Sequence, residues 1–306
     1  MKNIAVIGTG VIGTGWILRF LANGIKVKAF DKNFHQLNFL KDEITRTNLI
    51  IKKLYNTKVN FKNLEIADNI EEAVKNADLI QENVPERLSL KKDVIKNISK
   101  YSPSNSIIAS SSSGLLPSDL QSKCINPKRL IIAHPFNPVY ILPLVEIVKG
   151  KKTTNLYLNK AKKFYQKIKM KTLFVEKELP GFLSDRLQEA LWREGLHIVN
   201  EGFASTKDLD EAITYGPGMR WALMGTFLTF HLAGGEMGMK HMLDQFGPAL
   251  KLPWTKLKSP KLSKKLKEKI IKGTKKQSNN HSIKDLSNIR DNFLIDLLEL
   301  KKKYKL

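Results

Sequence analysis

The sequence predicts an α/β fold in which a doubly wound parallel sheet is followed by an all-helical C-terminal domain. In the first half, short apolar runs rich in β-branched residues alternate with helical patterns, which is typical of a parallel sheet. Beyond residue 181 only helical patterns follow. At 306 residues, a prior of about 150 residues per domain suggests two domains. We place the boundary in the Leu179-Pro180 segment, giving domains 1–179 and 180–306.

The amino-terminal stretch has the order strand, glycine turn, helix, strand and acid. In chain order these are residues 3–8, the G-x-G-x-x-G spacing of Gly8, Gly10 and Gly13, residues 11–23, residues 25–30, and Asp31. This order is the context that the dinucleotide-binding fingerprint requires. It predicts a Rossmann-type first domain whose ligand phosphates lie at the N-terminus of the first helix, where free N–H groups and the helix dipole favour negative charge.

Each residue of the glycine motif has an expected role. Gly8 permits the tight turn, Gly10 lets the backbone approach a pyrophosphate, and Gly13 lets helix and strand pack closely. Val11 and Ile12, which open the helix, are further expected cofactor contacts. Asp31 would accept hydrogen bonds from the adenosine ribose and repel a 2′-phosphate, so NAD is favoured over NADP, although Lys28 and Lys32 weaken that preference. The alternative, a purely structural glycine turn, is disfavoured by the flanking strand and acid.

The remaining elements of the first half follow in order. After a mostly helical and polar stretch over 34–76, we expect strands near 64–67, 77–82, 106–109 and 172–175, with a helix over 88–99 between the second and third of them. The third strand leads into the serine run 110–113. Because the carboxyl ends of parallel strands face the ligand crevice, these hydroxyls are placed to meet a substrate or the nicotinamide ribose. For Ser110 and Ser111 the simpler interpretation is a polar loop.

Residues 131–148 carry the candidate chemistry. An apolar run ends at His134, two prolines bracket a turn, and a second apolar run contains Glu146. A carboxylate in a buried strand is costly unless it is paired, and the nearest partner is His134. A neutral imidazole held by a carboxylate can accept a proton from an alcohol near neutral pH. The alternative is a solvated turn histidine and an edge-strand glutamate, and the glycine motif favours the first interpretation.

The second half is predicted to be helical throughout. The expected helices are 182–201, 206–214, 221–231, 236–246, 263–272 and 283–302.

The formal net charge of +23 is unusual, and 16 Lys or Arg against 5 Asp or Glu place +11 of it in residues 256–306. The excess is mostly lysine without interleaved aromatic residues, so we interpret it as solvated surface; a nucleic-acid-binding protein without catalysis is the minority alternative. The single cysteine, Cys124, excludes an intrachain disulfide and a cysteine-rich zinc site. No metal, no membrane partner, no specific nucleic-acid partner and a cytoplasmic location are expected, since no apolar signal or bilayer-spanning run is present.

Together, the glycine motif, the serine run, the His134-Pro135-Phe136-Asn137-Pro138 turn and Glu146 resemble the 3-hydroxyacyl-CoA dehydrogenase family over nearly the whole chain. The resemblance implies an NAD-dependent dehydrogenase in which His134 is the base and Glu146 orients it. It also places Ser113 at the substrate oxygen and Asn137 near the nicotinamide. Glu86 and Lys91 match residues close to the cofactor and the acyl chain. A homodimer through the helical half is implied as well.

Asp185 departs from the acyl-CoA enzymes, which have asparagine at this position. An ionised carboxylate cannot donate a hydrogen bond to a substrate oxygen. Several blocks of the second half instead resemble the branch of the family that oxidises the 3-hydroxyl of L-carnitine to 3-dehydrocarnitine. These blocks are residues 185–187, 190–194, 218–222, 233–236, 245–250 and 253–257. A 3-hydroxyacyl-CoA substrate, or another small hydroxy acid such as L-gulonate, remains the alternative.

Carnitine carries a trimethylammonium group that cannot form hydrogen bonds, and aromatic faces beside a carboxylate are the usual way to bind one. The candidates for this pocket are Asp185, Trp192, Trp221 and Tyr140, with Arg193 for the substrate carboxylate. Each has an ordinary alternative, because aromatic residues on helices are more often core and an arginine is often a structural ion pair.

Overall fold

The computed structural model describes residues 1–57, 59–234, 236, 238–246, 252–253, 255–256, 258, 261, 263–277 and 281–304. The chain forms two compact units. The first contains Met1–Arg186 together with Asp291–Ile295. The second contains Leu187–Arg290 together with Asp296–Leu306.

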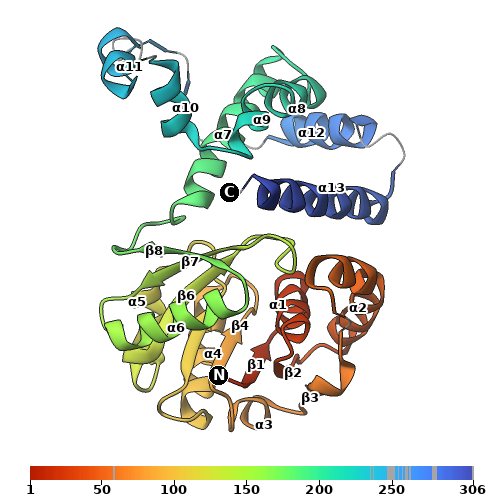
Figure 1. Ribbon diagram of the computed structural model, residues 1–306, viewed down its shortest axis with the longest axis vertical. Helices are drawn as coiled ribbons and strands as arrows, with labels where there is room; N and C mark the ends of the chain where they lie inside the picture. Colours follow the sequence, from red (N-terminus) through yellow and green to blue (C-terminus); the bar gives the residue numbers. More distant parts are fainter. Residues whose placement is uncertain are drawn as a thin grey trace. The chain divides into compact units, whose positions relative to one another are not determined.

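An eight-stranded sheet forms the centre of the first unit, in the order β3-β2-β1-β4-β5-β6-β7-β8 (Figure 1). The strands are β1 Asn3–Ile7, β2 Lys26–Phe30, β3 Leu64–Ile66, β4 Leu79–Glu82, β5 Ile107–Ser110, β6 Leu130–Pro135, β7 Leu144–Lys149 and β8 Lys171–Val175. Neighbouring strands are parallel except for β6 and β7, which are antiparallel. The predicted doubly wound α/β class is therefore confirmed, but the sheet is mostly rather than wholly parallel. The connection over 136–143 is too short for the crossover that a parallel pair needs.

Helices cover both faces of this sheet (Figure 1). They are α1 Val11–Ala22, α2 Phe34–Tyr55, α3 Ile70–Val74, α4 Leu88–Tyr101, α5 Pro117–Leu120 and α6 Asn155–Lys167, with short 3₁₀ turns at Phe61–Asn63, Gln121–Lys123 and Pro127–Arg129. On one face, Trp16 of α1 packs on Tyr165 of α6 with ring centroids 5.4 Å apart. On the other, Ile95 and Ile98 of α4 pack into a cluster with Ile132 of β6. Because side chains alternate along a strand, His134 shares this second face with Ile132.

The described part of the second unit contains helices and no strand, as predicted. The helices that follow the sheet are α7 Ser184–Glu201, α8 Thr206–Thr214, α9 Pro217–Trp221, α10 Thr226–Ala233, α11 Gly238–Phe246, α12 Lys264–Gln277 and α13 Ile283–Lys303. Residues 184–186 of α7 and Asp291–Ile295 of α13 belong to the first unit. The single helix expected over 221–231 is wrong. The chain turns after α9, where the N–H groups of Leu223 and Met224 both bond the Arg220 carbonyl, and Gly225 precedes α10 in extended backbone. Residues 235, 247–250, 254 and 257 of the resembling blocks lie outside the described residues.

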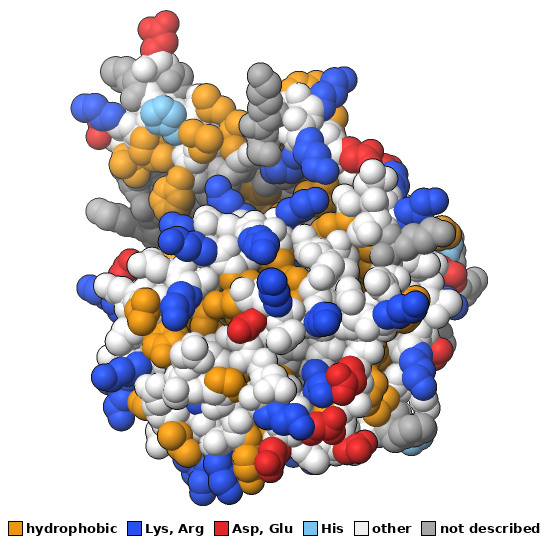
Figure 2. All heavy atoms as spheres, turned by 60° about the horizontal axis from the view of Figure 1, so that its bottom comes forward, with side chains coloured by type: hydrophobic (Ala, Val, Ile, Leu, Met, Phe, Trp, Pro, Cys, Tyr) orange, Lys and Arg blue, Asp and Glu red, His pale blue; other side chains and the backbone are white. Residues whose placement is uncertain are grey.

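Basic side chains are scattered over the face of the molecule seen in Figure 2, with acidic and apolar side chains between them. Some of the charge is compensated locally, as where Lys28 lies 2.5 Å from Glu65 and 3.5 Å from Glu72. On this face the basic side chains are dispersed among the other types and do not form one patch. Across the described residues, no helix combines the length and the apolar character needed to cross a bilayer.

Candidate active site

The glycine turn joins β1 to α1 at the carboxyl edge of the sheet. Gly8 has a φ of +90°, and a β-carbon there would lie 2.9 Å from the Asn83 carbonyl group. A β-carbon at Gly13 would lie 1.9 Å from the carbonyl oxygen of Gly8. At Gly10 the nearest atom would be the Gln36 side-chain oxygen at 3.7 Å, so this position is open. Gly8 and Gly13 are therefore fixed by internal packing, while Gly10 leaves room for a ligand.

Asp31 follows β2, and its carboxylate holds the glycine turn. The Thr9 N–H and hydroxyl donate to Asp31 Oδ2 at 2.7 and 3.3 Å, and the Asn33 N–H donates to Oδ1 at 2.9 Å. In the first turn of α1, Val11 is 55% exposed and Ile12 is half-buried. A helix start without a side-chain cap, beside an open glycine, suits a bound pyrophosphate. Asp31 lies next to this turn, where the adenosine ribose of the cofactor would bind. These residues fit a bound NAD.

His134 and Glu146 face each other directly across the antiparallel pair β6–β7. His134 Nδ1 lies 2.9 Å from Glu146 Oε2, and the glutamate is completely buried. The predicted contact between the two side chains is present. An ionised carboxylate can only accept a hydrogen bond, so Nδ1 carries a proton in this contact.

The second carboxylate oxygen of Glu146 binds the start of α7. Oε1 accepts hydrogen bonds from the N–H groups of Leu183 and Ser184 at 3.1 and 3.0 Å and from the Ser184 hydroxyl at 3.2 Å. Burial alone raises the pKa of Glu146, but the hydrogen bonds from His134 and Ser184 outweigh it and leave that pKa below its ordinary value. Glu146 is therefore an anion that couples β7, the histidine and α7.

The His134 imidazole lies between two rings and a second carboxylate. Its ring centroid is 5.0 Å from that of Phe136 and 5.7 Å from that of Phe182. Nε2 lies 3.4 Å from Asp185 Oδ2, in the first turn of α7. Phe182 is fully buried with a φ of +45°, a strained conformation of the kind that clusters at functional sites. Glu146 thus faces Nδ1, and Asp185 faces Nε2.

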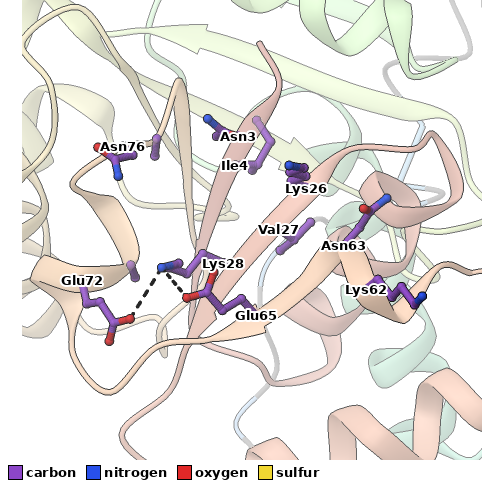
Figure 3. A pocket seen from close by; sticks show the side chains of 12 residues that line it. Asn3, Ile4, Lys26, Val27, Lys28, Lys62, Asn63, Glu65, Glu72 and Asn76 are labelled. Carbon is purple, nitrogen blue, oxygen red and sulfur yellow. Dashed lines mark ion pairs between the residues drawn. The ribbon is translucent and has the colours of Figure 1, made fainter.

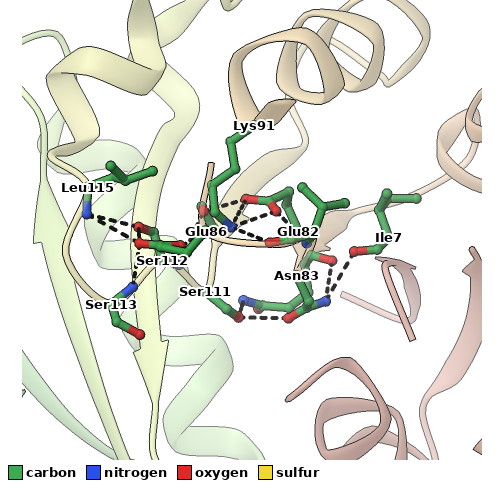
Figure 4. Close-up of polar contacts among 12 residues, drawn as sticks. Ile7, Glu82, Asn83, Glu86, Lys91, Ser111, Ser112, Ser113 and Leu115 are labelled. Carbon is green, nitrogen blue, oxygen red and sulfur yellow. Dashed lines mark hydrogen bonds and ion pairs between the residues drawn. The ribbon is translucent and has the colours of Figure 1, made fainter. Parts of the chain in front are cut away.

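The loop after β5 is organised by Glu86 (Figure 4). One oxygen, Oε1, accepts hydrogen bonds from the Ser112 hydroxyl and from the N–H groups of Ser113, Gly114 and Leu115 at 3.1, 3.2 and 3.4 Å. Burial raises the pKa of Glu86, but the Ser112 hydrogen bond and the nearby Lys91 charge lower it more, and the net shift is downward. Ser113 itself is exposed at this edge of the sheet.

Lys91 does not reach the surface, so the direct cofactor contact expected of it is wrong. Its ammonium group is buried, 2.9 Å from Glu82 Oε1 and 2.8 Å from the Val84 carbonyl oxygen, and 3.5 Å from Glu86 (Figure 4). Ser110 ends β5 and donates to Glu82 Oε2 at 2.5 Å. A buried ammonium group needs a carboxylate partner. Because that partner is Glu82, the Lys91 side chain lies behind the loop that carries Glu86.

The polar-loop interpretation is wrong for Ser110, whereas Ser111 does lie in the loop that follows β5. Ser110 is fully buried within β5. The Ser111 hydroxyl accepts from Trp16 Nε1 at 3.0 Å and Gln81 Nε2 at 2.9 Å, and donates to Asn83 Oδ1 at 2.7 Å. These hydroxyls tie β4, β5 and α1 together, because buried polar groups require partners.

The turn after His134 is held by Arg19 of α1, whose guanidinium donates to the carbonyl oxygens of Val139, Ile168 and Leu142 at 2.7, 3.3 and 3.0 Å. Asn137 is exposed on this turn. Tyr140 is not: it is 3% exposed, and its hydroxyl donates to Asp291 Oδ2 at 2.5 Å. Its place in a cation pocket is therefore wrong, because the ring packs inside the first unit and its hydroxyl is satisfied there.

Three expected substrate residues belong to the second unit. Trp192 on α7 is 54% exposed, and Trp221 at the end of α9 is 36% exposed. Arg193 Nε lies 2.9 Å from Glu189 Oε1 one turn earlier, in an exposed ion pair. The two indole rings are thus available on this unit, while Arg193 already has a partner.

A pocket of about 310 Å³ lies elsewhere in the first unit (Figure 3). It is lined by Asn3 and Lys26, which begin β1 and β2, and by the Lys28 ion pairs. Because the glycine turn follows the opposite ends of these strands, this pocket is not the candidate site. No group of three or more metal-binding side chains occurs among the residues that the structure describes.

Sequence reasoning missed the Glu82–Lys91 pair and the binding of Glu146 to the start of α7. The Glu82–Lys91 pair could have been predicted, because Glu82 ends an apolar strand. A buried charge at that position requires a partner, as it does at Glu146. The binding of Glu146 to the start of α7 could not, because backbone N–H groups leave no mark in a sequence.

Comparison with known proteins places these residues in a family. Residues 3–179 match the 3-hydroxyacyl-CoA dehydrogenase NAD binding domain, and residues 181–277 match the C-terminal domain of the same enzymes. The chain is 53% identical to L-carnitine dehydrogenase of Oceanobacillus iheyensis over 99% of each chain. It is 50% identical to L-carnitine dehydrogenase of Bacillus cereus, over 99% of this chain and 94% of the relative.

Among solved structures, the chain resembles the NAD⁺-dependent dismutase 5-formyl-3-hydroxy-2-methylpyridine 4-carboxylic acid 5-dehydrogenase. The TM-score is 0.83 at 25% identity, covering 99% of each chain. The two models of one family thus match consecutive parts of this chain and together cover most of it. The chain belongs to the 3-hydroxyacyl-CoA dehydrogenase family.

Proposed function

We propose that the protein oxidises the 3-hydroxyl group of L-carnitine to the ketone of 3-dehydrocarnitine, with NAD as the oxidant. The observation that carries this proposal is the His134 imidazole held between Glu146 and Asp185. The first carboxylate makes the imidazole a base, and the second gives the site a negative charge suited to a cation. The names of the relatives that match over their full length support the same substrate.

In this proposal His134 Nε2 removes the proton of the 3-hydroxyl group, because Nδ1–H is committed to Glu146. NAD, when bound, accepts the hydride from C3. The ionised Glu146 stabilises the imidazolium that forms, and Phe136 and Phe182 fix the plane of the ring. Ser113, on the loop held by Glu86, positions the substrate oxygen. Alignment of the reacting groups is thus the work of β5, β6, β7 and α7.

The cofactor contacts are proposed for the residues that face the carboxyl edge of the sheet. Backbone groups around Gly8, Gly10 and Gly13 hold the pyrophosphate, with Val11 and Ile12 at the helix start and Asp31 at the adenosine ribose; Glu86 and Asn137 lie toward the nicotinamide. Lys91 takes an indirect part, by neutralising Glu82 beside Glu86.

Trp192 and Trp221 are proposed to contact the trimethylammonium group of the substrate, and Arg193 its carboxylate. Replacing either tryptophan by leucine is expected to raise the KM for carnitine about 5- to 30-fold with a smaller change in kcat, since a cation–π contact is worth about 1–2 kcal/mol. Steady-state rates of NADH formation measure this. Leucine at the exposed Phe203 is the matched control, and unchanged KM values in both tryptophan variants would refute the aromatic pocket.

The direct test of the function is NADH formation with three substrates supplied in turn. L-Carnitine is expected to be oxidised, and 3-hydroxybutyryl-CoA and L-gulonate to react at least about 10²-fold more slowly. Preferred oxidation of the CoA ester would overturn the carnitine proposal while leaving the dehydrogenase intact.

The second unit is proposed to pair with a second copy of the chain. Helix α10 presents a cluster of apolar side chains to solvent: Phe227 is 85% exposed, and Leu228, Phe230 and Leu232 are also exposed. A contiguous exposed apolar surface of this kind typically marks a site of protein–protein contact. Sedimentation equilibrium is expected to give twice the chain mass for the wild type. For Phe227→Ser it is expected to give a higher dissociation constant of the dimer. A monomer at micromolar concentration would contradict this.

The buried, free Cys124 fits the proposed cytoplasmic location.

A further inference from the structure

Asp185 lies beside the imidazole of His134. Its Oδ2 atom is 3.4 Å from His134 Nε2, the nitrogen that faces the substrate, and its side chain is 32% exposed. The residue begins α7, in the turn whose neighbouring N–H groups are bound by Glu146. The carboxylate is therefore fixed relative to the base by the same glutamate that orients the base.

The chemistry of the substrate class makes this position informative. A substrate hydroxyl oxygen that is hydrogen-bonded to His134 Nε2 would lie about 2.8 Å from this nitrogen. In a molecule with an ammonium nitrogen on the carbon next to the alcohol carbon, that nitrogen lies about 3–4 Å from the hydroxyl oxygen. A carboxylate within 3.4 Å of Nε2 is then within direct electrostatic reach of the cation.

We infer that Asp185 is the specificity-determining residue that recognises a positive charge on the carbon next to the reacting alcohol. This inference rests on the proposed function and extends it, because it assigns the charge discrimination to one side chain of the first unit. A neutral substituent gains nothing from Asp185, and an anionic one is repelled by it.

The test compares L-carnitine with its uncharged isostere, 3-hydroxy-5,5-dimethylhexanoate of the matching configuration, in which a tert-butyl group replaces trimethylammonium. The measured quantity is the ratio of the two kcat/KM values. In Asp185→Asn, which keeps the side-chain shape and removes the charge, this ratio is expected to fall at least about tenfold, as for a partly exposed ion pair at this distance. Asp93→Asn, an exposed surface residue paired with Lys123, is the matched control and should leave the ratio unchanged.

The possible outcomes separate the inference from the proposed function. If the wild-type protein does not oxidise carnitine, the proposed function fails and this inference with it. If it does, and Asp185→Asn lowers both kcat/KM values by the same factor, Asp185 acts through His134 and the inference is overturned. NADH binding by fluorescence reports that each variant is folded. Should Asp185→Asn fail that check, Asp185→Ser provides the same comparison.

Discussion

Replacing Glu146 by glutamine is expected to lower kcat about 10³-fold while NAD still binds. Glu146 accepts hydrogen bonds at both oxygens, one from His134 and the other from the start of α7. Glutamine has one acceptor and one donor. If its oxygen stays with Leu183 and Ser184, its NH₂ group faces Nδ1, which must then accept. The proton moves to Nε2, and the base is lost.

The opposite orientation of the glutamine is also unfavourable, because its NH₂ group would point at two N–H donors in a buried site. That costs about 1–3 kcal/mol, so the first orientation and the wrong tautomer are favoured. Single-turnover NADH formation measures the effect, and Glu176→Gln at an exposed carboxylate is the control. A variant with wild-type kcat would show that Glu146 serves packing alone.

The same variant should change how stability depends on pH. The pKa of Glu146 is below its ordinary value of 4.5 in the folded protein, so the anion contributes stability above that pH. The contribution is lost as the pH falls through the lower, folded value. Thermal unfolding of the wild type should therefore lose its advantage over Glu146→Gln as the pH is lowered from 6 to 3. A constant difference across this range would contradict the assignment.

Elements whose signals are local could be predicted from the sequence. The strand–turn–helix–strand order around Gly8 to Asp31 depends on residues within thirty positions, and the structure has the same order. The break between α9 and α10 was missed because the apolar pattern of the sequence continues through Gly225. The backbone at Gly225 is extended, and the helix is interrupted there. The antiparallel β7 was readable in principle from the short connection 136–143, which excludes a crossover.

The contacts within the site also divide into those that the sequence could predict and those that it could not. His134 and Glu146 were paired because a buried charge requires a partner, and the reasoning extends to Glu82 and Lys91. The environment of Tyr140 was beyond such reasoning. Its partners, Arg46 and Asp291, are 94 and 151 positions away along the chain, and nothing local distinguishes a ring that joins them from one that faces a ligand. Asp185 beside His134 depends likewise on how α7 begins.

Alanine at Gly13 and alanine at Gly10 are each expected to weaken NAD binding, for two different reasons. At Gly13 the new methyl group would lie 1.9 Å from the carbonyl oxygen of Gly8. Neither atom can move without separating β1 from α1, so we expect a loss of about 3 kcal/mol in the free energy of unfolding. At Gly10 the methyl group meets nothing closer than 3.7 Å, so the apo protein should be as stable as the wild type. The methyl group instead occupies the approach of the pyrophosphate, and the Kd for NADH should rise roughly tenfold or more.

Thermal unfolding without cofactor and NADH fluorescence titration separate the two effects. Gly24→Ala is the control, since Gly24 has a φ of +70° but nothing lies within 4 Å of its added methyl group. It should lose only about 1 kcal/mol, from backbone strain, and bind NADH normally. If Gly10→Ala destabilised the apo protein as much as Gly13→Ala, the open space at Gly10 would not be a ligand site. The difference between the two glycines, rather than either loss alone, therefore tests whether this turn is built around a phosphate.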